Sequence, residues 1–233
     1  MQTVNLKFNQ RDYVIHLRDE VDQSVFNEIF KFEEYRCAKE KIKQAKAPIF
    51  DVGAHIGLFS LYCRAFNPAA MIYAWEPENN NLKILAENIE VNKLSNIKIV
   101  PAALGDQTGE GELVLSADNH NHHLAEYGDI NNQIQPVKVF GLGDFCRQNK
   151  IERLALLKTD IEGGEYKVFN DFAKGEWPMV ESIVLEYHNS RFRDYKQLEQ
   201  KLRENRFSVQ NFPSQFDKNM GFLWAVNKKA MLD

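Results

Sequence analysis

The sequence is poor in cysteine and has no long apolar run. Its three cysteines, Cys37, Cys63 and Cys146, are odd in number, far apart and without a CxxC pair. This pattern argues against a disulfide scaffold or a zinc module and favours reduced thiols. No apolar stretch approaches the roughly 18 residues of a membrane-spanning helix, and the first residues lack the charged-then-apolar layout of a signal peptide. We therefore expect a cytoplasmic protein that does not enter the membrane.

The sequence also lacks an excess of positive charge. Its 29 Lys and Arg residues are outnumbered by 33 Asp and Glu residues, for a formal net charge of −4. Proteins that bind nucleic acid by broad neutralisation of phosphates need the opposite balance. We therefore expect no nucleic-acid partner. The oligomeric state stays open, with a homodimer as one expectation.

Aromatic and aliphatic residues are plentiful. Of the 233 residues 44% are hydrophobic, including 16 Phe and 8 Tyr, which suffices for one large domain or one domain with an appendage. Residues 4–17 alternate between apolar and polar types around a polar turn, which predicts a β-hairpin. Residues 22–46 carry apolar side chains at helical spacing. We expect a hairpin and helical cap over residues 1–46 and a main domain over residues 47–233.

After Pro48, short apolar runs alternate with amphipathic segments. The runs predict strands at 49–53, 71–76, 97–100, 154–159 and 182–187, and the segments predict helices at 56–66, 80–92, 165–172 and 195–205. Buried strands separated by helices are typical of a parallel sheet built from βαβ units. A polar excursion over residues 105–136 interrupts this order. Two last strands, at 207–211 and 222–226, predict a terminal hairpin.

The first candidate motif is Asp51-Val52-Gly53-Ala54-His55-Ile56-Gly57, where a strand ends, turns and enters a helix. Gly53 permits the sharp turn, and Gly57 permits close approach of the helix. His55 occupies the second glycine position of the dinucleotide fingerprint GxGxxG, so that fingerprint fails. An acidic residue two positions before the first glycine suits a cationic ligand such as S-adenosylmethionine (SAM).

Glu76 ends the second predicted strand, about twenty residues after the glycine turn. At this place in nucleotide-binding βαβ units an acidic side chain accepts hydrogen bonds from ribose hydroxyls. Glu78 is predicted to lie at the start of the next helix, where its charge is favourable.

Two later strands also end in ionisable side chains. Asp160 and Glu162 follow one apolar strand, and Glu186 and His188 end the next. Spacing of two places Glu186 and His188 on the same side of their strand. These groups could serve as general bases or share a divalent cation. Glu165 is better explained as a helix cap than as a chemical group.

The polar excursion contains His120, His122 and His123 within Asp118-Asn119-His120-Asn121-His122-His123. Its spacing matches no closed zinc site, and no cysteine is near. We favour a loop that closes over substrate, although the role of the three histidines stays open.

With these motifs in place, the sequence resembles the FkbM-type methyltransferases, a family of class I SAM-dependent enzymes. The resemblance runs from about residue 48 to residue 188. It is carried by Phe50 to Gly57, Glu76-Pro77, Ala102-Ala103-Leu104-Gly105-Asp106, Leu157 to Glu165, and Glu186-Tyr187-His188. The sequence departs from the family at His55, where the family often has Asn.

The resemblance implies an α/β fold: a Rossmann-like seven-stranded sheet with helices on both faces and an antiparallel terminal hairpin, here with the N-terminal hairpin and helix appended. It also implies SAM bound above the carboxyl edge of the sheet and methyl transfer to a hydroxyl oxygen of a small molecule, such as a sugar or natural product. The cofactor-binding residues implied are Asp51, Gly53, Ala54, His55 and Gly57 for the methionine part, Glu76 and Pro77 at the ribose, and Ala103 to Asp106 at the adenine.

The predicted catalytic residues are Asp160, Glu186 and His188, acting as a base toward the acceptor hydroxyl or as ligands of a divalent cation. Sequence leaves these two mechanisms open, and it does not identify the acceptor. Two other functions also stay open. One is a SAM-binding domain without catalysis, and the other is a nicotinamide-dependent Rossmann oxidoreductase, against which the missing second glycine counts.

Overall fold

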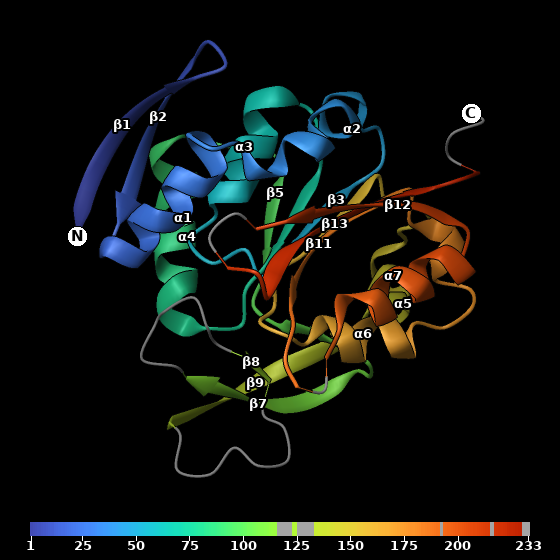
Figure 1. The fold of residues 1–233 in the computed structure, drawn as a ribbon. Coiled ribbons are helices and arrows are strands. Elements are labelled where there is room, and N and C mark those ends of the chain that lie inside the picture. Colours follow the sequence, from blue (N-terminus) through green and yellow to red (C-terminus); the bar gives the residue numbers. More distant parts are fainter. Residues whose placement is uncertain (116–122, 125–132, 192, 215–216, 230–233) are drawn as a thin grey trace.

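The protein is built around one seven-stranded sheet, seen in a computed structural model that describes residues 1–115, 123–124, 133–191, 193–214 and 217–229 (Figure 1). The strand order is β12-β13-β11-β10-β3-β4-β5. The strands are β3 (Ile49–Val52), β4 (Ile72–Trp75), β5 (Ile97–Val100), β10 (Leu156–Thr159), β11 (Ser182–His188), β12 (Phe207–Pro213) and β13 (Met220–Asn227).

The five strands from β5 to β11 are parallel, and β13 pairs antiparallel with both β11 and β12. The sequence-based prediction of a parallel sheet ending in an antiparallel hairpin is therefore confirmed. The predicted ends of these strands and of the four predicted helices agree with the observed ends to within two residues. These strands read as continuous apolar runs because both faces of the sheet are covered.

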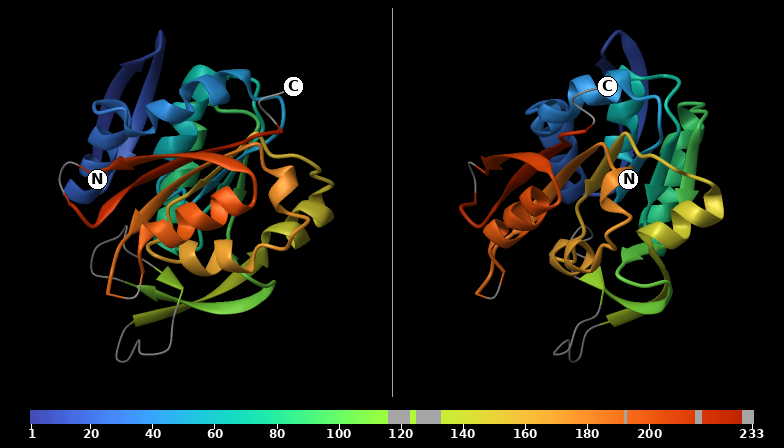
Figure 2. Two further views of the ribbon diagram at one scale, coloured as in Figure 1. Left: turned by 45° about the vertical axis from the view of Figure 1, so that its right-hand side comes forward. Right: turned by 90° about the vertical axis from the view of Figure 1, so that its right-hand side faces the viewer.

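Helices cover both faces of the sheet (Figure 2). Successive side chains of a strand point to opposite faces. Ile49 and Leu156 pack with α3 (Leu58–Phe66) and α4 (Asn79–Val91) on one face. Phe50 and Leu157 pack on the other face with α5 (Leu142–Asn149), α6 (Glu165–Asp171) and α7 (Tyr195–Glu204). The predicted fold class is confirmed.

The N-terminal segment forms the predicted hairpin and helices. Strands β1 (Gln2–Phe8) and β2 (Arg11–Leu17) pair antiparallel, followed by α1 (Glu20–Phe30), the 3-10 helix η1 (Glu34–Ala38) and α2 (Lys39–Gln44). We call residues 1–46 the cap. Its buried side chains belong to the same apolar cluster as those of α3 and the facing side of the sheet. The cap therefore shares its core with the sheet and does not pack separately.

The excursion contains more structure than the sequence predicted. Strands β6 (Ala103–Gly105), β7 (Gly109–Leu115), β8 (His123–Leu124) and β9 (Gln133–Gly141) form a second sheet in the order β6-β9-β7-β8, which lies beside one end of the main sheet (Figure 1). From the sequence we expected only a polar excursion over residues 105–136, and α5, which follows it, was also missed. His120 and His122, with the rest of the stretches 116–122 and 125–132, lie outside the described residues.

Among the helices that the structure describes, none has the length and apolar character needed to cross a membrane.

Candidate active site

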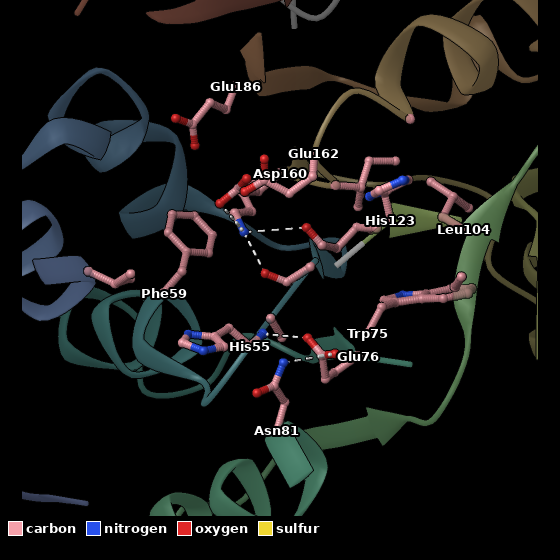
Figure 3. Close-up of a pocket in the computed structure, with 18 of the residues that line it drawn as sticks. His55, Phe59, Trp75, Glu76, Asn81, Leu104, His123, Asp160, Glu162 and Glu186 are labelled. Carbon is pink, nitrogen blue, oxygen red and sulfur yellow. Dashed lines mark hydrogen bonds and ion pairs between the residues drawn. The ribbon is translucent and has the colours of Figure 1, made fainter. Parts of the chain in front are cut away.

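A cavity of about 760 Å³ lies at the carboxyl ends of the central strands (Figure 3). The cap, the loop after β3, the end of β4, strand β6 and the ends of β10 and β11 all contribute to its wall. The predicted site residues that line it are Gly53, Ala54, His55, Glu76, Pro77, Ala103, Asp106, Asp160 and Glu186. Asp51, Gly57 and His188 are not among the lining residues. The topology therefore gathers most of the sequence motifs around one cavity.

The glycine turn after β3 is in backbone contact with the loop after β10. Gly53 has a φ of +73°, which residues other than glycine rarely adopt. A Cβ atom at this position would overlap the carbonyl oxygen of Asp160. Asp160 N–H in turn donates to the carbonyl of Val52 at 3.2 Å. Gly53 is therefore required by both its conformation and the closeness of the facing loop.

Asp51 is buried against α3 and is not among the residues that line the cavity. Its carboxylate is fully buried and accepts a hydrogen bond from Ser60 Oγ at 2.6 Å. Lys158, its register partner on β10, places Nζ 3.5 Å from Asp51 Oδ1. Register partners on neighbouring strands project to the same face. Asp51 thus supports the loop from beneath the cavity.

Lys158 is a residue of the site that the sequence did not single out. Its Nζ donates to the carbonyl of Gly53 at 2.8 Å and lies 3.5 Å from Asp160 Oδ2. Burial lowers the pKa of Lys158, but Asp160, Asp51 and Glu186 outweigh it and raise that pKa. A lysine inside an apolar strand was the available signal, because a buried ammonium needs paired acceptors. Lys158 joins the two loops that form the floor of the site.

Glu76 lines the cavity from the end of β4, with only 5% of its surface exposed. Its Oε2 accepts the backbone N–H of His55 at 2.8 Å, and its Oε1 accepts the N–H of Glu78 at 2.9 Å and Asn81 Nδ2 at 3.3 Å. Burial raises the pKa of Glu76 to about 7, against the lowering effect of these hydrogen bonds. Glu78 caps α4, as predicted, by accepting the Asn81 N–H at 2.7 Å.

The loop after β10 is closed by Glu165, the first residue of α6. Its buried carboxylate accepts the N–H of Ile161 at 2.6 Å and that of Gly163 at 2.8 Å. Burial raises the pKa of Glu165 to about 7. These bonds go to the loop that precedes α6, so in place of the predicted helix cap Glu165 fixes the loop carrying Asp160 and Glu162.

Several carboxylates meet on one side of the cavity, opposite His55, Glu76 and Asn81 (Figure 3). Burial and the neighbouring Asp160 raise the pKa of Glu162 to about 9, and the same causes raise that of Glu186. Glu34 of the cap joins this group, since burial, Glu28 and Asp160 raise its pKa to about 7. This side of the cavity therefore favours positive charge or bound protons.

His188 lies next to these carboxylates. Its Nε2 is 3.4 Å from Glu162 Oε2 and 3.9 Å from Glu186 Oε1. The predicted placement of Glu186 and His188 on the same side of β11 agrees with these distances. Within the part of the chain that the structure describes, no group of three or more His, Cys, Asp or Glu has the arrangement of a metal site.

The other end of the cavity is less polar. Trp75, Ala103, Leu104 and Val168 line it, and His123 of β8 faces it as well. Asp106, at the edge of this region, is 3.2 Å from Lys167 Nζ. The arrangement offers an apolar slot next to Glu76, which suits a planar heterocycle attached to a hydroxylated sugar.

Comparison with known proteins agrees with this architecture. Among curated relatives, the sequence is 28% identical over 194 residues to methyltransferase sdnD of Sordaria araneosa, covering 70% of this chain and 74% of that protein. It is 22% identical over 206 residues to 31-O-demethyl-FK506 methyltransferase FkbM of Streptomyces tacrolimicus, covering 76% and 78%. A further relative, methyltransferase 1 of Beauveria bassiana, is 26% identical over 163 residues, and the match spans 65% of its length.

Solved structures share the fold. Methyltransferase FkbM from Methylobacillus flagellatus superimposes with a TM-score of 0.56 at 16% identity, covering 77% of this chain and 43% of that one. SMU.1697c from Streptococcus mutans, solved in complex with S-adenosylhomocysteine (SAH), superimposes with a TM-score of 0.52 at 8% identity, covering 83% and 97%.

Residues 51–209 match the methyltransferase FkbM domain, a span that contains the glycine turn, Glu76, the loop after β10 and the end of β11. The chain therefore belongs to the FkbM methyltransferase family.

Proposed function

We propose that the protein transfers a methyl group from SAM to a hydroxyl oxygen of a small molecule. The observation that carries this proposal is one cavity in which the glycine turn and Glu76 face a group of carboxylates across the carboxyl edge of the sheet. Ligands of open α/β sheets bind at this edge. Family membership favours SAM over a nicotinamide cofactor.

The residues present fit SAM. Burial raises the pKa of Glu76 to about 7, and hydrogen bonds donated by the two ribose hydroxyls would stabilise its ionised carboxylate. The apolar slot beside Trp75, with the Ala103 to Asp106 turn, suits the adenine. The loop from Gly53 to His55 would hold the methionine part, and Asp51 would act from beneath by fixing that loop through Lys158.

When bound, SAM supplies a methyl group on a positively charged sulfonium, which becomes a neutral thioether after transfer. The chain must hold the acceptor oxygen in line with that methyl group, and alignment of this kind contributes roughly 7–11 kcal/mol in favourable cases. The acceptor hydroxyl also loses its proton. We assign that proton to Glu186, which lines the cavity 3.9 Å from His188 Nε2. Burial and Asp160 raise the pKa of Glu186, and the positive sulfonium of bound SAM would favour the ionised carboxylate that accepts the proton.

Asp160 and His188 have supporting places in this proposal. Asp160 lines the cavity next to Lys158, and its carboxylate belongs to the group that would attract the positive sulfonium. His188, beside both Glu162 and Glu186, would pass the proton on from Glu186. The divalent cation remains the alternative way to activate the hydroxyl.

The acceptor side of the cavity is bounded by the cap. Val25, Ile29 and Phe59 provide apolar surface there, while Glu28 and Glu34 provide carboxylates. The Streptomyces relative is named for an oxygen-linked methyl group on FK506. A hydroxylated sugar or natural product with an apolar face is the acceptor class that this surface and that relative support.

A methyl-transfer screen tests the proposal. Purified protein is incubated with radiolabelled SAM and a panel of hydroxylated sugars and polyketides, with and without a chelator, and calorimetry compares SAH with NAD. We expect SAH binding, and transfer that Glu186→Gln reduces by about a hundredfold. Micromolar binding of NAD without binding of SAH would refute the proposal. SAH binding without transfer to any acceptor would favour a non-catalytic SAM-binding domain, and loss of transfer with chelator would favour the cation.

A further inference from the structure

The cap reaches the cofactor side of the cavity through Arg18, the residue after β2. Its guanidinium donates to both carboxylate oxygens of Asp22, Nε to Oδ2 at 3.0 Å and Nη2 to Oδ1 at 2.8 Å. The same Nη2 lies 2.6 Å from His55 Nε2, and Nη1 donates to Asn81 Oδ1 at 2.7 Å. One side chain of the cap thus holds the glycine-turn loop and α4 together.

Both contacts lead to Glu76. Asn81 Nδ2 donates to Glu76 Oε1, and the backbone N–H of His55 donates to Glu76 Oε2 at 2.8 Å. Arg18, Asn81, Glu76 and His55 therefore form a closed ring of contacts around the carboxylate (Figure 3 shows the last three). The planar fork of arginine can serve several acceptors in fixed directions, which a lysine cannot do.

Asp22 makes this arrangement rigid. Its side chain is fully buried in the first turn of α1, and its Oδ1 lies 3.2 Å from His55 Nε2. Burial alone would raise the pKa of Asp22, but the hydrogen bonds from His55 and Arg18 outweigh burial and hold that pKa well below its usual range. A buried carboxylate with this degree of pairing is costly to disturb.

His55 itself has an unusual backbone. Its φ is +52°, in the left-handed region where residues other than glycine and asparagine are uncommon. Its ring Nε2 lies against Asp22 and Arg18, and its backbone N–H donates to Glu76 Oε2.

We propose that Arg18 and Asp22 are positioning residues of the cofactor site, which fix Glu76 for the ribose hydroxyls through His55 and Asn81. The inference rests on the proposed function, because it takes SAM as the ligand of Glu76. It gives the cap a role in binding the cofactor as well as the acceptor. Helix α1 connects the cofactor part of the cavity with the acceptor part. Its Asp22 contacts His55 of the glycine-turn loop, and its Val21, Val25 and Ile29 line the cavity.

The test measures how well the protein distinguishes SAH from its 2′-deoxyribose analogue by calorimetry. The variant is Arg18→Lys, and the matched control is Lys41→Met, which removes a different ion pair of the cap, 2.6 Å from Glu181. Glu181 keeps Arg153 as a partner at 2.8 Å, so the control leaves no buried charge unpaired. Thermal unfolding is recorded for each protein.

In the wild type we expect SAH to bind about tenfold more tightly than the deoxy analogue, the value of roughly one hydrogen bond to a charged group. In Arg18→Lys we expect SAH affinity to fall about tenfold and the preference for SAH to shrink to about twofold. Lys41→Met is expected to keep both values. A loss of stability alone would not change the preference between two ligands that differ in one hydroxyl.

A second variant covers the case in which Arg18→Lys does not fold. His55→Asn keeps a residue that tolerates the left-handed backbone but has a shorter side chain to meet Arg18 and Asp22. We expect it to lower the preference for SAH as well. Unchanged preference in the folded variants would overturn the positioning role while leaving the proposed function intact. Failure of the wild type to bind SAH would overturn both.

Discussion

The ionisation of Glu76 leads to a prediction about pH. In the free protein its pKa is raised to about 7 by burial, so near neutral pH the carboxyl group is divided between its two protonation states. Ribose hydroxyls that donate hydrogen bonds favour the ionised state. Binding of SAH should therefore lower this pKa and release a proton, and affinity should rise with pH through the range from 6 to 8.

The size of the effect follows from the fraction of ionised carboxyl. A group with a pKa near 7 is about 10% ionised at pH 6 and about 90% ionised at pH 8, so apparent affinity changes by roughly tenfold between them. At pH 7 about half a proton should leave per SAH bound. For stability the sign is opposite. The raised pKa of Glu76 favours the folded state below about pH 4.5, and that contribution is lost as pH rises through 7.

Calorimetric titrations at pH 6, 7 and 8 measure the affinity for SAH. Repeating the titration at pH 7 in two buffers of different ionisation enthalpy gives the number of protons released, from the difference in heat. Glu76→Gln should bind SAH weakly with no dependence on pH. Glu34→Gln is the matched control, because burial raises the pKa of Glu34 to about 7 as well, on the acceptor side of the cavity. A flat affinity between pH 6 and 8 in the wild type, or the same slope in Glu76→Gln, would refute the reasoning.

Three further predictions concern the loops beneath the cavity. Gly53→Ala should abolish detectable SAH binding in calorimetry, because its Cβ would overlap the facing loop and its φ of +73° is unfavourable for alanine; micromolar binding would contradict this. Lys158→Met should lower the free energy of unfolding in urea by about 3–5 kcal/mol, since it leaves the buried Asp51 without its cation, whereas Lys167→Met, at an exposed pair, should cost no more than about 1 kcal/mol. Glu162→Gln should stabilise the ligand-free protein at pH 8 and not at pH 4. The pKa of Glu162 is raised from 4.5 to about 9 in the folded protein, so the wild type loses stability as pH rises above 4.5. Equal unfolding midpoints of variant and wild type at pH 8 would count against this prediction.

The sheet could be predicted from the sequence because its signals are local. Each buried strand is an apolar run that ends at a turn, and the glycine turn and Glu76 occupy strand ends where their chemistry is recognisable. The second sheet was missed for the opposite reason. Strands β7 and β9 pair across the excursion, and β9 carries Pro136 and alternating polar residues that a single sequence does not distinguish from a loop.

The candidate site shows the same division. Local motifs identified the residues that face the cavity, such as Gly53, Glu76 and Asp160. They did not show that Asp51 is buried against α3 and absent from the cavity lining, because the surroundings of a strand residue depend on the sheet and the helices packed on it. The assignment of each residue to a part of SAM or to proton transfer remains a prediction.

The sequence by itself determined where most strands and helices of the main sheet lie along the chain, the family and the identity of most residues at the carboxyl edge, since these depend on patterns only a few residues long. Only the tertiary structure decided what supports them. Lys158 meets the Gly53 carbonyl across two adjacent strands, and Arg18 reaches His55 and Asn81, which follow it by 37 and 63 residues. The first contact arises from the pairing of β3 with β10 and the others from the way the cap packs on the sheet, and no local pattern encodes them.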